Sequence, residues 1–173
     1  MSGARSSGAT DGGTSARVFG SFLSWMQEKT SPVFVIATAN DIGQLPPELL
    51  RKGRFDELFF VDLPDDNERD AIWRIHISQR GRDADTFDVH SFVQLSEGFT
   101  GSEIQQAVTD AMFDCFDLGK ELDTSALVCA IDGTVPLSIT MAEQIKGLRQ
   151  WAGNRARRAS SRSSSDGNRR IAA

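Results

Sequence analysis

The segment V-F-V-I-A-T-A-N at residues 33–40 decides the expected fold. An unbroken apolar run that ends in a polar amide is typical of a buried parallel strand, which carries apolar side chains on both faces. Polar groups that follow such strands lie at the carboxyl edge of the sheet, where open α/β folds bind their ligands. We therefore expect a parallel strand over 33–38 that delivers Asn40 to a phosphate-binding edge.

A second segment, L-L-R-K-G-R-F-D at residues 49–56, follows closely. It places Arg51 and Arg54 on either side of Gly53, which is expected to end a short helix. A guanidinium keeps its charge and offers a planar fork of donors, so it can neutralise charge on phosphate oxygens. We therefore expect the amide and the displaced arginine pair to be the phosphate-sensing half of a nucleotide hydrolase. The half that grips the nucleotide is not in this sequence.

Composition and periodicity divide the chain into four parts. Residues 1–14 are almost entirely Ser, Gly, Ala and Thr, which predicts a flexible segment. Residues 15–64 are expected to be the C-terminal part of an α/β nucleotide-binding subdomain. Residues 65–152 carry apolar residues at helical spacing, which predicts an all-helical domain. Residues 153–173 are rich in Arg and Ser, and we expect a disordered basic tail there.

Four or five helices are expected in the helical part, and two of them begin with a capping box. Thr100 and Glu103 form the first, and Thr140 and Glu143 form the second. The elements expected before them are a helix over 15–29, the strand over 33–38 and a second parallel strand over 57–61.

Length and composition narrow the class of protein. The 173 residues suit one domain or part of a larger one, and 39% apolar content supports a buried core. No apolar run approaches the ~20 residues that span a bilayer, so no membrane partner is expected.

Cys115 and Cys129 lack C-x-x-C spacing, which favours reduced thiols in a cytosol. His76 and His90 have no further ligands nearby, so no metal site is expected.

The formal net charge of −5 is unevenly distributed. Residues 153–173 hold six arginines and one aspartate, a net charge of +5, so the rest of the chain carries −10. A basic tail suggests nucleic acid as a partner. The tail has no aromatic residues to stack on bases, which favours a solvated terminus instead.

The run from Thr38 to Asp56 resembles the second region of homology of AAA ATPases, the hexameric ring motors. T-A-N after an apolar strand, then G-R-F-D, then an apolar strand ending in V-D-L-P agree with that family in order and spacing. The turn G-F-T-G-S-E-I at 98–104 extends the resemblance over about residues 15–152. The sequence of residues 45–64 looks closest to little-characterised AAA proteins of bacteria and plastid genomes. The resemblance implies the C-terminal part of a P-loop αβα sandwich with two parallel strands, followed by a helical lid over 65–152.

The resemblance also implies roles for three polar residues. Asn40 matches sensor 1, which donates to the terminal phosphate and accepts from the attacking water. Arg51 and Arg54 match the arginine fingers, which reach the site of a neighbouring subunit. On local grounds alone, Asn40 is equally well explained as a cap at a strand end. Solvated surface side chains are likewise the ordinary explanation for the two arginines.

Three small residues match the sensor 2 turn of the family. Gly98, Gly101 and Ser102 are expected to let the backbone approach the adenine and ribose, so they are the candidate cofactor-binding residues. Locally, a plain helix N-terminus explains Thr100 and Gly101 just as well.

Two motifs of a complete ATPase do not occur in the sequence. There is no G-x-x-x-x-G-K-[S/T] phosphate loop, and no Asp-Glu pair follows an apolar strand. The family places both before Ser15, so we expect the chain to be the C-terminal fragment of a longer protein, inactive alone. The resemblance implies ATP and Mg²⁺ as cofactors held mainly by the missing half. It also implies a hexameric homo-oligomer that acts on a protein or another macromolecule in the bacterial cytosol or the plastid stroma.

Two other functions stay open from the sequence. A naturally truncated subunit would not hydrolyse ATP and would act only as a finger donor or interaction module. A nucleic-acid-binding module would use the arginine-rich tail. If the family's strand order applies, a strand is missing between 33–38 and 57–61, so we expect residues before 65 to be unstable alone. The helical part is expected to fold independently.

Overall fold

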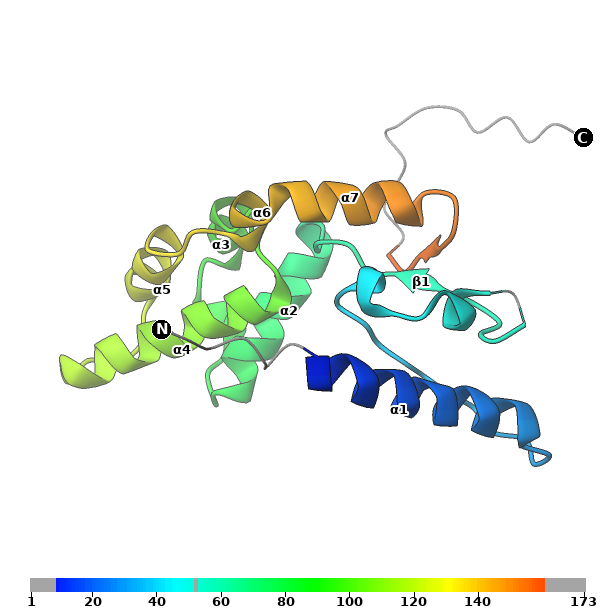
Figure 1. The fold of residues 1–173 in the computed structure, drawn as a ribbon. Helices are drawn as coiled ribbons and strands as arrows, with labels where there is room; N and C mark the ends of the chain where they lie inside the picture. Colours follow the sequence, from blue (N-terminus) through cyan, green and yellow to red (C-terminus); the bar gives the residue numbers. More distant parts are fainter. Residues whose placement is uncertain (1–8, 52, 161–173) are drawn as a thin grey trace, which may run out of the picture. The chain divides into compact units, whose positions relative to one another are not determined.

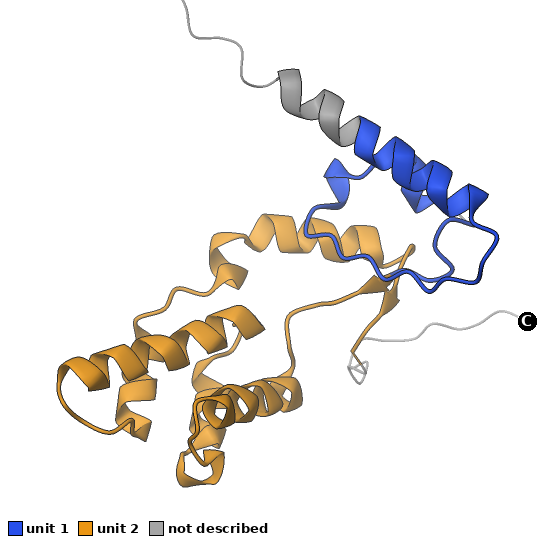
Figure 2. Cartoon of the chain, turned by 90° about the horizontal axis from the view of Figure 1, so that it is seen from below, with its two compact units in different colours: residues 1–58 blue, residues 59–173 orange. Residues whose placement is uncertain are grey.

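Helix α1, Ala9–Glu28, opens the described part of the chain, which comprises residues 9–51 and 53–160 of the computed structural model (Figure 1). The chain divides into two compact units, residues 1–58 and residues 59–173, coloured separately in Figure 2. Unit 1 holds α1 and the short 3-10 helices η1 and η2, Ile42–Gln44 and Pro47–Leu50. The elements of unit 2 are β1 Phe59–Phe60, α2 Asp66–Gln79, η3 Ala84–Thr86, α3 Val89–Leu95, α4 Gly101–Asp117, α5 Thr124–Asp132, α6 Leu137–Thr140, α7 Ala142–Ala152 and β2 Arg157–Arg158.

The first helix starts earlier than expected. We predicted a flexible segment over 1–14, but α1 is helical from Ala9, whereas residues 1–8 lie outside the described residues. Each glycine in a helix costs about 1 kcal/mol relative to alanine, and Gly12 and Gly13 lie in this first part. Once a helix is nucleated, however, each added residue also adds one hydrogen bond, so the helix extends through them.

The strand predicted over 33–38 is absent, and this prediction was wrong. The backbone at 33–38 is irregular, and Phe34 and Ile36 are 89% and 79% exposed. A strand needs a neighbouring strand to pair its N–H and C=O groups. Among residues 9–51 and 53–160, the only paired strands are β1 and β2, so the run at 33–38 has no ladder to join.

Two parallel strands are present, as predicted, but they are not the two that we expected. Phe59–Phe60 lies within the predicted second strand, and its partner comes from Arg157–Arg158 in the predicted disordered tail. Phe59 pairs with Arg157 and Phe60 with Arg158, and the Ala159 N–H donates to the Phe60 carbonyl oxygen over 2.9 Å. The tail is therefore ordered as far as its strand, and residues 161–173 lie outside the described residues.

The core of unit 2 forms where α2, α3, α4 and α5 pack together. Trp73 is fully buried, and its ring lies 5.2 Å from that of Phe92, centroid to centroid. The indole N–H of Trp73 donates to the Ser96 hydroxyl over 3.0 Å, and that hydroxyl donates to the Phe92 carbonyl oxygen over 2.6 Å. The polar groups of this aromatic centre are thus paired as burial requires. The helical content predicted for 65–152 is present.

One of the two predicted capping boxes is confirmed. Thr100 and Glu103 form it at the start of α4. Thr140 and Glu143 do not form the other, because Thr140 is the last residue of α6 and its hydroxyl donates to the Leu137 carbonyl oxygen over 3.4 Å. Helix α7 begins after Met141 without a side-chain cap.

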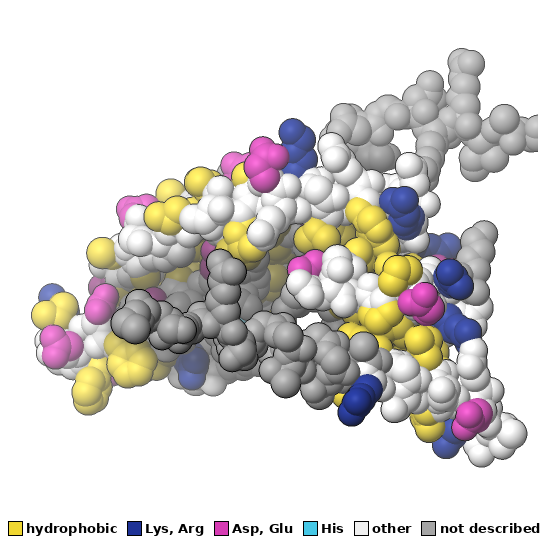
Figure 3. All heavy atoms as spheres, viewed as in Figure 1, with side chains coloured by type: hydrophobic (Ala, Val, Ile, Leu, Met, Phe, Trp, Pro, Cys, Tyr) yellow, Lys and Arg dark blue, Asp and Glu magenta, His cyan; other side chains and the backbone are white. Residues whose placement is uncertain are grey.

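Large apolar side chains lie exposed on both units. Val33, Phe34 and Ile36 are exposed in unit 1, and Phe113 and Phe116 on α4 are exposed in unit 2. Figure 3 shows hydrophobic side chains, in yellow, at the surface beside acidic ones.

Limited proteolysis is expected to separate the two units. Leu49 is the one buried apolar residue of unit 1 among the described side chains, whereas the core of unit 2 is built from four helices. Few buried apolar contacts favour local opening. We expect cleavage before Phe59 first and a resistant fragment that spans α2 to α5. A single cooperative melt that includes both units, with no early cleavage before Phe59, would contradict this.

Acid is expected to weaken unit 2 through two aspartate caps. The Ser91 hydroxyl and N–H lower the pKa of Asp88 at the start of α3, and the Ala126 N–H and Ser125 hydroxyl lower the pKa of Asp123 at the start of α5. Because each folded pKa lies below the unfolded value, the caps stabilise fully above about pH 4, and this contribution is lost as the pH falls through the lower folded pKa.

The measurement is the urea midpoint of the chain as a function of pH. We expect the midpoint to fall below about pH 4. The variant with both Asp88→Asn and Asp123→Asn keeps a capping side chain without a titrating group. If the urea midpoint of this variant falls just as steeply below about pH 4, the two aspartates are not the cause of the fall.

Candidate functional site

The turn from Arg51 to Arg54 follows η2, which the buried Leu49 anchors in unit 1. The Arg54 N–H donates to the Arg51 carbonyl oxygen over 3.3 Å, and Gly53 has φ of +88°. Glycine adopts this conformation without strain, so the chain reverses directly between the two arginines. Both guanidinium groups therefore leave one tight turn, with Arg51 exposed and Arg54 half-buried.

Gln27, in the last turn of α1, contacts Arg54. With its amide oriented so that the oxygen faces the guanidinium, the Gln27 side chain accepts from both terminal nitrogens of Arg54. This contact orients the guanidinium without neutralising its charge, since the amide is neutral. Nothing in the sequence marks the pair, because the two residues lie far apart and a glutamine at a helix end is common.

Asn40 lies in irregular backbone just before η1, and its side chain is exposed. The neighbouring Asp41 caps η1 by accepting from the Gly43 N–H over 2.8 Å. Within the described part of the chain, no hydrogen bond or ion pair joins Asn40 to Arg51 or Arg54. The structure thus places the two arginines in one turn, and no hydrogen bond in the described part of the chain links Asn40 to them.

The turn from Gly98 to Ser102 lies in unit 2, at the start of α4. Glu103 secures it with one carboxylate oxygen, Oε2, which accepts from the Thr100 N–H over 2.7 Å and from the Thr100 hydroxyl over 2.8 Å. The Cβ of a residue at Gly101 would meet Ile72 at 3.7 Å, an ordinary contact, whereas Ser102 is exposed. The backbone at Gly98–Ser102 is therefore held firmly, and Ser102 faces solvent.

Gly98 is the most constrained of the three small residues. Its φ is +81°, and a Cβ there would collide with the Ser138 side chain, whose own Cβ would lie 3.2 Å away. We expect Gly98→Ala to destabilise the chain by about 1–3 kcal/mol, from the left-handed backbone and the collision together.

The matched control for this change is Gly119→Ala, because Gly119 has φ of +62° and open space around it. It isolates the backbone cost of about 1–2 kcal/mol. The measurement is the urea denaturation midpoint of each variant. Equal losses at the two positions would show that Ser138 imposes no constraint on the turn.

Unit 2 also contains a buried arginine that the sequence did not single out. Arg69 on α2 is 5% exposed, and its guanidinium donates to the Pro64 carbonyl oxygen over 2.9 Å, the Val93 carbonyl oxygen over 3.2 Å and the Asp66 carboxylate over 2.8 Å. It thereby ties the segment between β1 and α2 to α3. The signal was available, because Arg69 shares the helical spacing of Trp73 and Ile77 on the core face.

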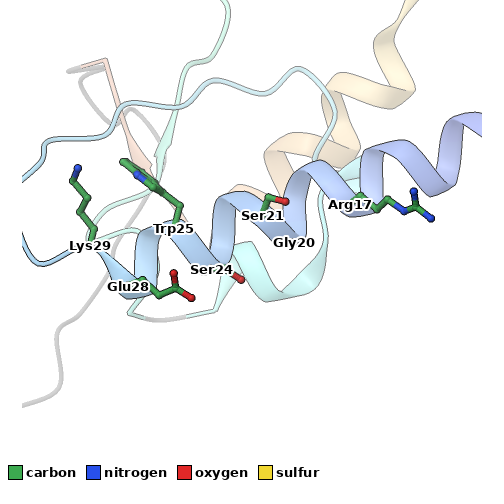
Figure 4. A pocket seen from close by; sticks show the side chains of 7 residues that line it. All are labelled: Arg17, Gly20, Ser21, Ser24, Trp25, Glu28 and Lys29. Carbon is green, nitrogen blue, oxygen red and sulfur yellow. The ribbon is translucent and has the colours of Figure 1, made fainter.

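No three His, Cys, Asp or Glu side chains lie close enough to hold a metal ion among residues 9–51 and 53–160. The surface hollow in Figure 4 is lined by residues of a single stretch, Arg17 to Lys29. It is therefore one face of α1 and its border, and it includes none of the predicted site residues.

Among residues 9–51 and 53–160, no single helix is long and apolar enough to cross a membrane. The bent pair Thr124–Thr140 and Ala142–Ala152 meets that test of length and composition only when its two parts are taken together.

Comparison with known proteins agrees with the motifs. Residues 1–63 match the model of the family described as ATPase family associated with various cellular activities (AAA). This match of residues 1–63 confirms the resemblance to the AAA family that was drawn from the motifs.

Its relatives include uncharacterised AAA domain-containing proteins called ycf46. The one from Pyropia yezoensis is 50% identical over 162 residues, which cover 92% of this chain and 32% of that protein. The one from Guillardia theta is 46% identical over 143 residues, or 82% of this chain and 28% of that protein. The proteasome-activating nucleotidase of Sulfurisphaera tokodaii is 34% identical over 102 residues, or 58% of this chain and 26% of that protein. The chain spans about a third of the length of the curated relatives that it matches.

Proposed function

We propose that this chain supplies the phosphate-sensing part and the lid of an AAA ATPase module. In this proposal Asn40 is sensor 1, Arg51 and Arg54 are arginine fingers, and the turn at Gly98–Ser102 approaches the nucleotide. The helices of 65–152 are the lid. The single observation that carries the proposal is the tight turn that presents two guanidinium groups, in a segment that matches the AAA family model.

The donor set suits the polyphosphate of ATP, the substrate class of this family. Arg51 is exposed, and a guanidinium stays charged and forms bidentate hydrogen bonds to phosphate oxygens. ATP, when bound, supplies the phosphoryl group that is transferred to water. Arg51 and Arg54 would neutralise the charge that spreads over the phosphate oxygens, and Asn40 would orient the attacking water.

Among the described residues, no cluster of three carboxylate, imidazole or thiolate groups could hold Mg²⁺ by itself. Oxygen ligands are what Mg²⁺ requires. In the proposal these ligands, and the loop that cradles the phosphates, lie in the part of the longer protein that this chain does not contain. ATP turnover therefore requires both parts.

The partners follow from the same proposal. Fingers that act on a neighbouring site require an oligomer, which we propose to be a homomeric ring. Its substrate would be a protein or another macromolecule, and its compartment a bacterial cytosol or a plastid stroma. Arg54 has Gln27 as a partner within its own unit, which leaves the guanidinium charged and therefore competent for an anion on another subunit.

Mixing two inactive variants tests the proposal. We use a chimera in which this chain replaces the matching segment of the Pyropia yezoensis relative. One variant carries Asn40→Ala, and the other carries Arg51→Ala with Arg54→Ala. A subunit of the second kind keeps its Asn40 and receives intact arginines from a neighbour of the first kind, so the mixture is expected to regain part of the ATP turnover.

The control is a chimera that carries all three substitutions, which should restore nothing when mixed with either variant. If the mixture of the two variants hydrolyses ATP no faster than the mean of its components, the arginines do not act between subunits. If neither variant alone loses turnover, the three residues do not serve the reaction at all.

A further inference from the structure

Glu103 uses both of its carboxylate oxygens on different parts of unit 2. Oε2 holds Thr100 at the start of α4, as described above, and Oε1 accepts from the Leu137 N–H over 2.6 Å. Leu137 is the first residue of α6, and Pro136 before it provides no side-chain cap. The first N–H groups of a helix need partners from outside it, so Glu103 caps α6 as well as α4. Gly98 also lies against Ser138, so the turn and the start of α6 meet at two adjacent points.

Helices α6 and α7 form an arm over residues 137–152, with a break at Met141, and this arm leads from this point to strand β1 (Figure 1). Arg149 in the last turn of α7 binds Asp62, two residues after β1, through Nη2 at 2.8 Å and through Nε at 2.9 and 3.1 Å. The Asp62 side chain is only 6% exposed, and its Oδ1 also accepts from the Leu63 N–H over 2.8 Å. Beyond α7, strand β2 pairs with β1.

The Arg149–Asp62 pair differs from an ordinary surface ion pair on the same unit. Arg82 and Glu121 also approach to 2.7 Å, and Arg82 is 40% exposed against 41% for Arg149. Glu121, however, is 82% exposed, whereas Asp62 is nearly buried. Solvent screens an exposed pair, and removing a charged partner from a nearly buried carboxylate carries a larger penalty. Arg149 therefore fixes the end of the arm, while Arg82 fixes nothing comparable.

We propose that the arm of α6 and α7 couples the turn at Gly98–Ser102 to strand β1, with Glu103 and Arg149 as the positioning residues that fasten its two ends. The coupling itself rests on contacts within unit 2. Its role in catalysis rests on the proposed function, since it would link the turn that approaches the nucleotide to the strand that follows the arginine pair. A bound nucleotide would then bias the position of the strand after the fingers through a packed, hydrogen-bonded element.

Hydrogen exchange on the chain itself tests the coupling. Glu103→Gln leaves a single side-chain oxygen, which cannot accept from both Thr100 and Leu137, because the amide nitrogen only donates. We expect faster exchange at the Leu137 amide and also at the distant Leu63 and Ala159 amides, by about threefold or more. Arg149→Gln is expected to act in the reverse direction, on the Leu137 and Thr100 amides, because coupling is reciprocal.

Two controls and a double variant complete the experiment. Arg82→Gln and Glu143→Gln should leave all of these amides unchanged. The double variant Glu103→Gln with Arg149→Gln should raise exchange by less than the product of the two single effects, since breaking one end already frees the arm. Effects confined to the mutated end would overturn the proposal. An equal rise at core amides such as those of Ile104 and Val108 would also overturn it, because it would indicate global destabilisation.

The same two substitutions in the Pyropia yezoensis chimera separate this proposal from the proposed function. Coupling to the nucleotide predicts a KM for ATP raised severalfold with kcat changed less. If the exchange effects are present but the Arg51→Ala and Arg54→Ala chimera keeps its turnover, the arm stands and the proposed function fails. If the arginine variants lose turnover but the exchange effects are absent, the proposed function stands and the coupling fails.

Discussion

Replacing Arg51 and Arg54 together by alanine in the Pyropia yezoensis chimera is expected to lower ATP turnover by about 10³-fold or more. A guanidinium that neutralises transition-state charge contributes roughly 10³–10⁵ in rate where arginine fingers have been dissected in GTPases. The loss should appear in kcat, because the interaction forms mainly as charge develops on the transferred phosphoryl group. The measurement is steady-state ATP hydrolysis by the assembled oligomer.

Three further variants of the chimera define the cause of that loss. Arg54→Lys keeps the charge but loses the planar fork, so it should recover only part of the rate. Gln27→Ala removes the partner that orients Arg54 and should lower kcat by a smaller factor than Arg54→Ala. Arg17→Ala changes an exposed arginine on α1 and should have no effect. Unchanged turnover in the double alanine variant, with the oligomer intact, would refute a catalytic role for the pair.

Arg69→Met is expected to destabilise the chain by about 2–4 kcal/mol. Methionine fills a similar volume but leaves the Pro64 and Val93 carbonyl oxygens without the donors that Arg69 provides. A buried polar group that loses its partner costs about 1–3 kcal/mol. The measurement is the free energy of unfolding of the chain in urea, followed by circular dichroism.

Arg74→Met is the matched control, because Arg74 lies on the same helix and also pairs with carboxylates. Its side chain is 44% exposed, and Asp70 and Asp85 are its partners at 2.8 and 2.7 Å. Screened surface pairs contribute about 0–1 kcal/mol, so this change should cost little. Equal losses in the free energy of unfolding for Arg69→Met and Arg74→Met would contradict the role of Arg69 as a buried link between the segment before α2 and α3.

The elements that depend on local signals could be predicted from the sequence. The capping box of Thr100 and Glu103 and the apolar face of α4 that follows it are set by side chains within a few turns of one helix. The tight turn around Gly53 was likewise predictable, because a glycine after a short helix favours a reversal of the chain. The two arginines therefore flank a turn that the sequence predicts.

The elements that depend on a distant partner could not be predicted. The apolar run at 33–38 has a strand-like composition, but a strand forms only where another offers hydrogen bonds, and none in the described part does. Thr140 and Glu143 have the spacing of a capping box, yet Thr140 already belongs to α6. The contacts of Gln27 with Arg54 and of Glu103 with Leu137 join residues that local patterns do not connect.

Strand β2 has a practical consequence for anyone who shortens this protein. A truncation placed at Ala152, where the last helix ends, would strip Phe60 of the Ala159 amide and leave β1 with no partner in the described part of the chain. An open edge of this kind invites pairing between molecules. Recombinant samples that stop at that boundary are therefore expected to self-associate, and a stop after Ser160 would retain the protecting segment.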